Sequence, residues 1–418
     1  LNKEIIALTR QTGQQMTKSA WDFPESGSSS PAADEEEKPV SYRALVLTGY
    51  GGYDKIKLQV KSMKMPPQLK AGEVLVRVKA CGLNFAELLG KQGLYELLPS
   101  PPVTLGMEGS GVIEAVAEDV GDRVIAMNRH GMWQELAAVP ANRTFPIPDG
   151  MSFEEAAALP INYMTAYMML FEMANLRPGK SVLIHMAAGG VGIAATQLCQ
   201  TVQDVTIFGT ASASKHETIS QGGVTHPIDY RTKDYVTEIR NISPKGVDIV
   251  LDPLGGADTQ KCFSLLKPLG MLIVFGAANC VTGQKKNLLA MAKTWYNQLT
   301  LNTLKLMQTN KAISGFHLGY IQDQELFERT LLALLELYRQ GKIKPRIDSS
   351  YHFEEVAEAM KRMHDRQNIG KIILLPEPKK TEEKPKSNAE AAENVEKNEA
   401  AVSEKKEEAT EEVKAEED

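Results

Sequence analysis

His185-Met186-Ala187-Ala188-Gly189-Gly190-Val191-Gly192 is a glycine-rich segment that indicates the fold class of this chain. An apolar, β-branched run at residues 181–184 precedes it, and residues 193–199, rich in helix formers, follow it. A glycine-rich loop between a strand and a helix is the context in which dinucleotides bind. The alternative is an ordinary turn without a ligand. The second strand that follows in order favours dinucleotide binding.

Three small residues of this loop have separate expected roles. Gly189 lets the backbone approach a pyrophosphate, and Gly192 allows the helix to pack closely against the strand. The helix N-terminus adds free N–H groups and the positive end of a dipole. Ala187 stands where the G-x-G-x-x-G motif has its first glycine, and it is small enough for the tight turn.

The chain has 418 residues and a net charge of −6, which is distributed unevenly. Residues 377–418 carry a net −7 and residues 1–40 a net −3, which leaves +4 on residues 41–376. This length suffices for two domains and tails, and we expect both tails to be disordered because they have little to bury. A core of this charge suits a phosphate-bearing cofactor and is too weakly basic to indicate nucleic-acid binding.

The four cysteines are scattered without a CxxC pair or a Cys/His cluster, so we expect reduced thiols and no structural zinc. The N-terminus lacks a compact apolar signal segment. No apolar run reaches the roughly 18–20 residues that a membrane span needs. We therefore expect any membrane association of this chain to be peripheral.

The first part of the chain alternates apolar and polar positions, as half-buried antiparallel strands do. Strands are expected at residues 43–47, 72–80, 109–117, 122–126, 135–139 and 143–147. Ser152, followed three residues later by Glu155, marks a helix start. Helices are expected at residues 154–159 and 165–174. From residue 181 onward, alternating strands and helices predict a doubly wound parallel sheet. Their expected ranges are 181–184, 193–199, 205–209, 215–221, 236–242, 247–251, 258–266 and 271–276.

The last section predicts an amphipathic helix at residues 325–340, strands at 346–348 and 371–375, and a helix at 353–366. We therefore predict an α/β chain in which a Rossmann-type parallel-sheet domain interrupts a β-rich domain. The expected boundaries are 1–40 for a disordered N-terminal segment, 41–163 and 306–376 for the β-rich catalytic domain, 164–305 for the nucleotide-binding domain, and 377–418 for a disordered acidic tail.

The end of the second strand of the nucleotide-binding domain indicates the type of cofactor. An NAD-preferring fold usually has Asp or Glu there, whereas this chain has Phe208-Gly209-Thr210-Ala211-Ser212-Ala213-Ser214-Lys215. Hydroxyls and a lysine donate to a 2′-phosphate, which an acid would repel, so we favour NADPH. The alternative is that Ser214 caps the next helix and Lys215 is solvated on the surface.

The chain resembles the medium-chain dehydrogenase/reductase superfamily, in its quinone oxidoreductase branch. The matching motifs occur in the family's order and are Cys81-Gly82-Leu83-Asn84-Phe85, Gly106-Met107-Glu108-Gly109-Ser110-Gly111, Gly121-Asp122-Arg123-Val124, Thr165-Ala166-Tyr167, residues 187–192 and Asp252-Pro253-Leu254-Gly255-Gly256. The resemblance implies that the β-rich domain is GroES-like. The segment at residues 112–124 is shorter than in relatives.

The resemblance also shows what this chain lacks. Zinc alcohol dehydrogenases have a Cys near the position of Asn84 and a His where Met107 stands, and neither residue here is a good zinc ligand. The four-Cys zinc lobe is missing too. We therefore expect no catalytic metal. The resemblance implies hydride transfer to a quinone or an α,β-unsaturated carbonyl rather than alcohol oxidation.

Residue by residue, the resemblance implies three catalytic positions. Asn84 would orient cofactor or carbonyl with its amide, Tyr95 would donate a proton or hydrogen bond, and Glu87 stands where relatives often have Asp. Leu89 replaces a second Tyr of some relatives. The alternatives are that Asn84 is a turn residue and that Tyr95 is a packing ring.

The resemblance further implies a set of cofactor contacts. They are Thr165, Ala188, Gly189, Gly190, Val191, Gly192, Ser212, Ser214, Lys215, Tyr230, Phe275, Gly276, Asn279, Asn368 and Lys371. Tyr230 matches the 2′-phosphate site of relatives. The segment at residues 368–371 has an ordinary turn as its alternative interpretation.

A second hypothesis is a peripheral membrane or regulatory protein that retains the NADPH fold. The resemblance to a membrane-associated group within the branch implies a cytoplasmic protein on vesicles or the mitochondrial outer membrane, negative regulation of mitochondrial fusion, mitofusins as partners, and a homodimer. A basic and aromatic stretch, with Lys285, Lys286, Lys293, Trp295, Tyr296 and residues 304–307, would contact the membrane. Its alternative interpretation is a helix that covers the substrate cleft.

Overall fold

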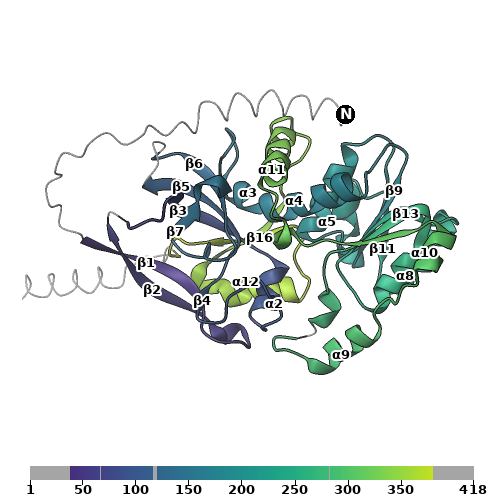
Figure 1. Ribbon diagram of the computed structural model, residues 1–418, viewed down its shortest axis with the longest axis horizontal. Coiled ribbons are helices and arrows are strands. Elements are labelled where there is room, and N and C mark those ends of the chain that lie inside the picture. The colour runs from purple at the N-terminus through teal and green to yellow at the C-terminus, as the bar shows by residue number, and fades with distance from the viewer. Residues whose placement is uncertain (1–37, 66, 116–119, 282, 380–418) are drawn as a thin grey trace, which may run out of the picture. The chain divides into compact units, whose positions relative to one another are not determined.

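A parallel sheet of six strands, in the order β11-β10-β9-β12-β13-β14, forms one half of the described chain. The computed structural model describes residues 38–65, 67–115, 120–281 and 283–379 (Figure 1). The strands are β9 Ser181–Ile184, β10 Thr206–Ala211, β11 His226–Asp229, β12 Val247–Asp252, β13 Leu266–Val274 and β14 Ala312–Gly315. The helices between and after them are α5 Gly190–Gln200, α6 His216–Gln221, α7 Tyr235–Ile242, α8 Ala257–Leu265, α9 Leu288–Tyr296 and α10 Thr303–Thr309.

The strand order of this sheet reverses next to β9, because the chain runs outward from β9 to β10 and β11 and then returns to β12. All four residues of β9 are buried, as expected for a central parallel strand covered by helices on both faces. In open α/β sheets, ligands bind outside the carboxyl ends of the strands at such a switch point. The glycine-rich loop leaves β9 at that point.

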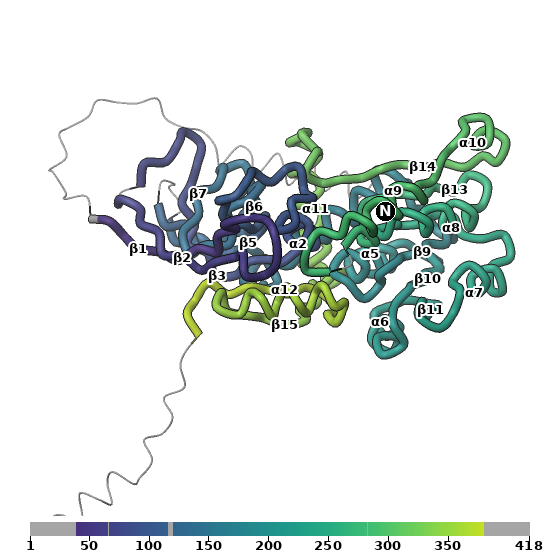
Figure 2. Tube along the Cα trace, turned by 90° about the horizontal axis from the view of Figure 1, so that it is seen from below, coloured from purple at the N-terminus to yellow at the C-terminus, as the bar shows by residue number. Residues whose placement is uncertain are grey.

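A sheet of seven strands forms the other half, in the order β15-β16-β3-β5-β6-β8 with β7 paired to β3. Its strands are β3 Glu73–Leu83, β5 Glu108–Ala115, β6 Arg123–Met127, β7 Leu136–Pro140, β8 Thr144–Pro146, β15 Ile347–His352 and β16 Lys371–Leu375. A smaller sheet has the order β2-β1-β4, with β1 Lys38–Leu47, β2 Ile56–Met65 and β4 Val103–Thr104. Because β16 pairs antiparallel with β3, the end of the chain returns to complete the first domain (Figure 2).

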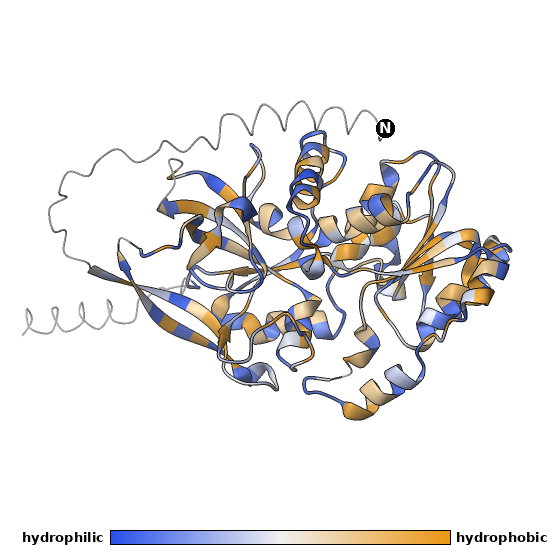
Figure 3. Ribbon diagram, viewed as in Figure 1, coloured by the Kyte–Doolittle hydropathy of each residue, from blue (hydrophilic) through white to orange (hydrophobic). Residues whose placement is uncertain are grey.

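Helices from both ends of the chain surround these sheets. They are α2 Phe85–Gly90, α3 Phe153–Ala158, α4 Pro160–Tyr167, α11 Gln324–Arg339 and α12 Val356–His364. Shorter turns are η1 Tyr53–Lys55, η2 Ala141–Arg143, η3 Met168–Met173, η4 Ala213–Lys215, η5 Ala278–Cys280, η6 Leu318–Tyr320 and η7 Phe353–Glu355. The predicted cap of α3 is present, since the Ser152 side chain accepts the Glu155 N–H at 3.1 Å. Apolar residues concentrate on the parallel strands and the helices that cover them (Figure 3).

The predicted fold class is confirmed, with several local differences, and α2, β4, α9 and α10 are among the elements that were not predicted. The helix predicted at residues 165–174 is instead the end of α4 followed by the π-turn η3. The strands β2 and β11 were not predicted; β11 contains Pro227, which is tolerated because β11 is an edge strand. β14 belongs to the parallel sheet. This sheet therefore extends beyond residue 305, the predicted end of the nucleotide-binding domain. The other boundaries stay predictions, and the predicted tails lie almost wholly outside the described residues.

Candidate functional site

A cleft of about 1700 Å³ runs along the carboxyl ends of the parallel strands and continues against the seven-stranded sheet. Its lining includes the whole segment from Ala188 to Gly192 on one side, and Asn84, Tyr95 and Lys371 on the other. Clefts that combine apolar walls with a few polar groups are the usual ligand sites of proteins.

The glycine-rich loop packs as its sequence predicts. A Cβ on Gly192 would lie 2.5 Å from the Met186 carbonyl oxygen and 2.7 Å from Ala187, both backbone contacts that cannot yield. A Cβ on Gly190 would meet Asn162 of α4 at 2.1 Å. The start of α5 therefore lies directly against the end of β9. Its first residues, whose N–H groups have no acceptor within the helix, line the cleft.

A buried network holds the strand ends beneath this loop. The His185 ring contacts the Thr210 hydroxyl through Nδ1 at 3.0 Å and the Cys262 thiol through Nε2 at 3.1 Å. Burial lowers the pKa of His185, so the ring is neutral at pH 7. The Asp252 carboxylate accepts the Leu254 N–H at 2.8 Å and so fixes the loop after β12. The His185 contacts connect the end of β9 with β10 and α8.

Positive charge gathers where β10 ends. The Lys215 ammonium donates to the backbone carbonyls of Arg366 and Asn368, at 2.6 and 2.7 Å. Burial lowers the pKa of Lys215, and the charges of Arg231 and Arg366 add to that effect. The alternative interpretation of Lys215 as a solvated surface residue is wrong, because its ammonium has these two partners. Tyr230 lines the cleft beside it and is 38% exposed.

The two serines of this region differ. Ser212 lines the cleft, whereas Ser214 is not among the lining residues and contacts the Ser212 hydroxyl at 3.4 Å. Ser214 does not cap the next helix, whose N-cap position is Lys215. Of the residues expected to contact the cofactor, Ser214 alone lies outside the cleft lining.

A buried charge cluster forms the floor of the cleft. Glu108, fully buried, accepts from the Lys371 ammonium at 2.5 Å and from the Asn84 amide at 2.8 Å through Oε1. Its Oε2 accepts the Ile161 N–H at 2.8 Å. Lys371 is only 3% exposed. Its ammonium also donates to Asn84 Oδ1 at 2.6 Å. Asn84 is therefore a member of this cluster, and not only a turn residue.

Glu87 lies behind this cluster rather than in the cleft. Its Oε2 accepts the Asn84 N–H at 2.8 Å, while Oε1 has no hydrogen-bond partner among the described residues. Burial raises the pKa of Glu87 to about 8, and the charge of Lys371 opposes this rise. Glu87 is absent from the lining of the large cleft. The catalytic role expected for Glu87 stays a prediction, and its position does not place the carboxylate in contact with a molecule bound in the cleft.

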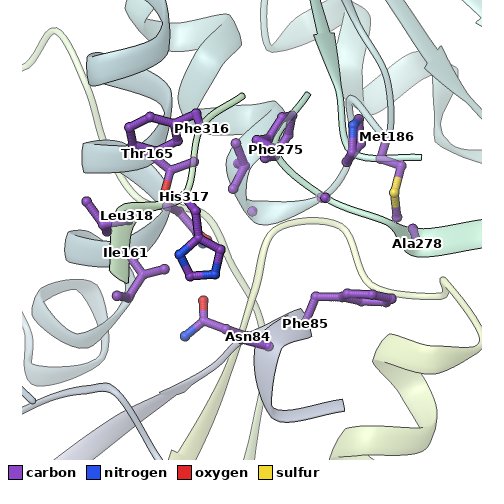
Figure 4. Close-up of a pocket in the computed structure, with 18 of the residues that line it drawn as sticks. Asn84, Phe85, Ile161, Thr165, Met186, Phe275, Ala278, Phe316, His317 and Leu318 are labelled. Carbon is purple, nitrogen blue, oxygen red and sulfur yellow. The ribbon is translucent and has the colours of Figure 1, made fainter. Parts of the chain in front are cut away.

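Tyr95 and His317 also line the cleft, near Asn84. The Tyr95 hydroxyl donates to the Met107 sulfur at 3.7 Å, and burial raises the pKa of Tyr95 to about 12. The His317 ring stacks on the Tyr95 ring with centroids 5.5 Å apart. In Figure 4 the imidazole projects into the pocket opposite Asn84. Sequence reasoning missed His317, because a lone histidine after a short apolar strand carries no local signal.

The residues at the position expected for zinc offer a poor donor set. Asn84 and Met107 line the cleft there, and the sulfur of Met107 already accepts the Tyr95 hydroxyl. Within the described ranges, no group of three or more His, Cys, Asp or Glu side chains is arranged to hold a metal ion. The prediction of a metal-independent site stays a prediction.

Two family models match the chain. The model described as "Alcohol dehydrogenase GroES-like domain" matches residues 70–149, and the model described as "Zinc-binding dehydrogenase" matches residues 222–374. The first covers most of the seven-stranded sheet. The second covers the later part of the parallel sheet and the return of the chain to the first domain.

Similar proteins carry two kinds of name. "Synaptic vesicle membrane protein VAT-1 homolog" of Danio rerio is 68% identical over 84% of this chain and 73% of its own length. The human protein of that name is 59% identical over 81% of this chain and 87% of its own length. "Quinone oxidoreductase" of Rattus norvegicus is 30% identical over 80% of this chain and 97% of its own length.

Solved structures agree with these matches. The human VAT-1 homolog-like protein superimposes with a TM-score of 0.70 and 46% identity, covering 81% of this chain and 99% of that one. Escherichia coli quinone oxidoreductase complexed with NADPH gives a TM-score of 0.69 and 26% identity, covering 80% and 100%. The chain therefore belongs to the medium-chain dehydrogenase/reductase superfamily and, within it, to the family of VAT-1 homologues.

Proposed function

We propose that this protein is an NADPH-dependent reductase that transfers a hydride to quinones or α,β-unsaturated carbonyls without a catalytic metal. One observation carries the proposal: a single cleft connects the glycine-rich loop and the cationic end of β10 with an apolar pocket that contains polar side chains. The similarity to rat quinone oxidoreductase, and to an E. coli quinone oxidoreductase whose structure contains NADPH, supports it.

The residues of the nucleotide end fit a dinucleotide with an extra phosphate. The N–H groups at the start of α5 would hold the pyrophosphate, because helix N-termini favour anions. Lys215 uses two of its three ammonium hydrogens on backbone carbonyls, which leaves the third for a 2′-phosphate. Tyr230 and Ser212 line the cleft beside it. When bound, the reduced nicotinamide supplies the hydride.

The acceptor end orients a flat carbonyl compound and excludes water. Phe85, Ile161, Phe316 and Leu318 form apolar walls around the space between Asn84 and His317 (Figure 4). The Asn84 amide donates one of its two N–H hydrogens to Glu108 and retains the second for cofactor or acceptor. The cluster of Glu108 and Lys371 holds this amide in place, so that it is oriented before any ligand binds.

A comparison of NADPH with NADH tests the cofactor assignment. We expect Lys215→Ala to weaken NADPH binding about 10–100-fold and to leave NADH binding unchanged, because one charge-assisted hydrogen bond contributes roughly 1.5–3 kcal/mol. Quenching of intrinsic fluorescence measures both affinities. Lys342→Ala, an exposed lysine outside the cleft lining, is the matched control. Equal affinity of the unaltered protein for both dinucleotides would contradict the assignment.

Peripheral membrane association is a second candidate function, favoured by the surface of α9. Leu289, Trp295 and Tyr296 are 84, 74 and 85% exposed, and the exposed Lys293 lies on the same short helix. Apolar and aromatic side chains beside lysines suit an anionic lipid surface. No described residue of α9 lines the cleft, which disfavours the alternative that this segment covers the substrate. Among the described helices, none is long and apolar enough to cross a membrane.

Vesicle flotation tests this second function. We expect the full chain to float with vesicles containing phosphatidylserine, and the double variant Trp295→Ser/Tyr296→Ser to remain unbound, while NADPH affinity is unchanged. A vesicle or a mitochondrial outer membrane as its location, and mitofusins as partners, stay predictions from sequence. The predicted homodimer has an available site in β14, the terminal strand of the parallel sheet.

A further inference from the structure

His317 lies at the centre of the acceptor pocket but had no role in the sequence prediction. It precedes η6 and projects between the apolar walls toward Asn84 (Figure 4). The Tyr95 ring stacks against one side, and the Tyr320 ring meets it edge-on with centroids 4.9 Å apart. Tyr320 is itself bonded to Glu96 through its hydroxyl at 3.4 Å. The imidazole is therefore held in one orientation by contacts on two sides.

The hydrogen bonds of the ring determine which nitrogen carries the proton. Nδ1 of His317 accepts the Gly319 backbone N–H at 3.1 Å, and a backbone N–H can only donate. In the neutral imidazole the single proton must then be on Nε2. Burial lowers the pKa of His317, which favours the neutral ring at pH 7. Among the described residues, Nε2 has no hydrogen-bond partner, although its ring lines the cleft.

Tyr95 is less well placed for this task. Its hydroxyl donates to the Met107 sulfur at 3.7 Å, so the hydrogen that the sequence prediction assigned to an acceptor has a partner within the protein. Burial raises the pKa of Tyr95 to about 12, so it gives up a proton less readily than an ordinary tyrosine. The free Nε2–H of His317 is the alternative donor on the same wall of the pocket.

We propose that His317 is a catalytic residue whose neutral Nε2–H donates a hydrogen bond to the carbonyl oxygen of the acceptor, while Tyr95 and Gly319 position the ring. The proposal rests on the proposed reductase function and deepens it. The acceptor carbon receives a hydride from C4 of the reduced nicotinamide, with both electrons of the C–H bond that breaks, and the nicotinamide is thereby oxidised. The π-electron pair displaced in the acceptor moves onto its carbonyl oxygen. His317 stabilises that oxyanion and keeps its proton, and solvent water supplies the proton that neutralises the oxygen afterwards.

Two substitutions separate hydrogen bonding from ring packing. His317→Gln places an amide N–H near the position of Nε2, whereas His317→Leu fills space without a donor. We expect His317→Leu to lower kcat/KM for a quinone at least 30-fold and His317→Gln to lower it less than fivefold, with NADPH affinity unchanged in both. Equal losses in the two variants would overturn the proposal.

Two readouts do not depend on turnover. Selective ¹⁵N-histidine labelling gives spectra of only seven histidines, and the His317→Gln variant assigns the resonance. We expect a neutral ring protonated on Nε2 at pH 7; a ring protonated on Nδ1 or on both nitrogens would overturn the proposal. We also expect 4-nitrophenolate, an oxyanion probe, to bind the unaltered protein at least tenfold tighter than His317→Leu. Equal binding, or none, would overturn it.

These readouts also distinguish this proposal from the proposed function. If the protein binds no NADPH, the reductase assignment fails, while the tautomer of His317 and the binding of 4-nitrophenolate are still measurable. If NADPH binds and is oxidised by quinones but His317→Leu retains full activity, the reductase assignment stands and the role of His317 fails.

Discussion

Replacing Lys371 by Met should destabilise the protein by about 3–5 kcal/mol, the cost of leaving a buried carboxylate without its counter-ion. Glu108 is fully buried, and the substitution leaves it the N–H groups of Asn84 and Ile161 but no positive charge in contact. Protonating a carboxylate of ordinary glutamate pKa at pH 7 costs about 3–4 kcal/mol. Because protonation would remove the unpaired charge, the loss of folding stability cannot be much larger than this value.

Urea unfolding of the cofactor-free protein measures this loss. Trp133 is a suitable fluorescent reporter, because it is buried in the same domain and donates to the Gly82 carbonyl at 3.1 Å. Lys361→Met is the matched control: its ammonium pairs with Asp365 one helical turn away on an exposed face, and its loss should cost at most about 0.5 kcal/mol.

A double variant completes the experiment. Lys371→Met combined with Glu108→Gln removes both charges, and we expect it to recover at least about 2 kcal/mol of the loss, because a buried pair contributes little net stability when both partners are replaced. A cost below about 1 kcal/mol for the single variant would refute the reasoning. A double variant no more stable than the single one would refute it as well.

Three further predictions concern single residues. Burial raises the folded-state pKa of Glu87 to about 8, so its contribution to stability is fully present below the ordinary pKa of a glutamate and is lost as pH rises toward 8. By urea midpoints, Glu87→Gln should therefore be more stable than the unaltered protein by at least about 1 kcal/mol at pH 8.5 and equal to it near pH 4.5. Parallel pH profiles of the two proteins would contradict this. Gly192→Ala, whose Cβ would meet backbone at 2.5 Å, should weaken NADPH binding at least tenfold in a fluorescence titration. Gly179→Ala should leave NADPH binding unchanged, because its Cβ would meet open space outside the cleft, although the φ of +75° at Gly179 is itself unfavourable for alanine. Tyr95→Phe keeps the ring contact with His317 and loses only the contact to Met107, so kcat should change less than fivefold; a loss of 100-fold would return the donor role to Tyr95.

The glycine-rich loop and β9 could be predicted because their signals are local. An apolar strand, small residues and a helix follow one another within twenty positions, and the close contact of Gly192 with Met186 arises from the same turn. The family motifs likewise follow in a fixed order. The parallel sheet and the β-rich domain could therefore be derived from the sequence.

The charge cluster could not be derived in this way. Asn84, Glu108 and Lys371 are brought together by the pairing of β3 with β5 and with β16, across 287 residues between Asn84 and Lys371. The sequence prediction named Asn84 and Lys371 individually and treated Glu108 only as part of a motif. The role of a residue here depends on its partners, and these are set by sheet topology.

Isotope transfer tests the central claim most directly. NADPH deuterated at C4 is mixed with the protein and an α,β-unsaturated ketone, and the reduced ketone is analysed by mass spectrometry. We expect one deuterium at the β-carbon of the product when the transferred position of NADPH is labelled, and none at that carbon when only the solvent is deuterated. Product without deuterium from NADPH, or no oxidation of NADPH with any enone or quinone, would contradict it.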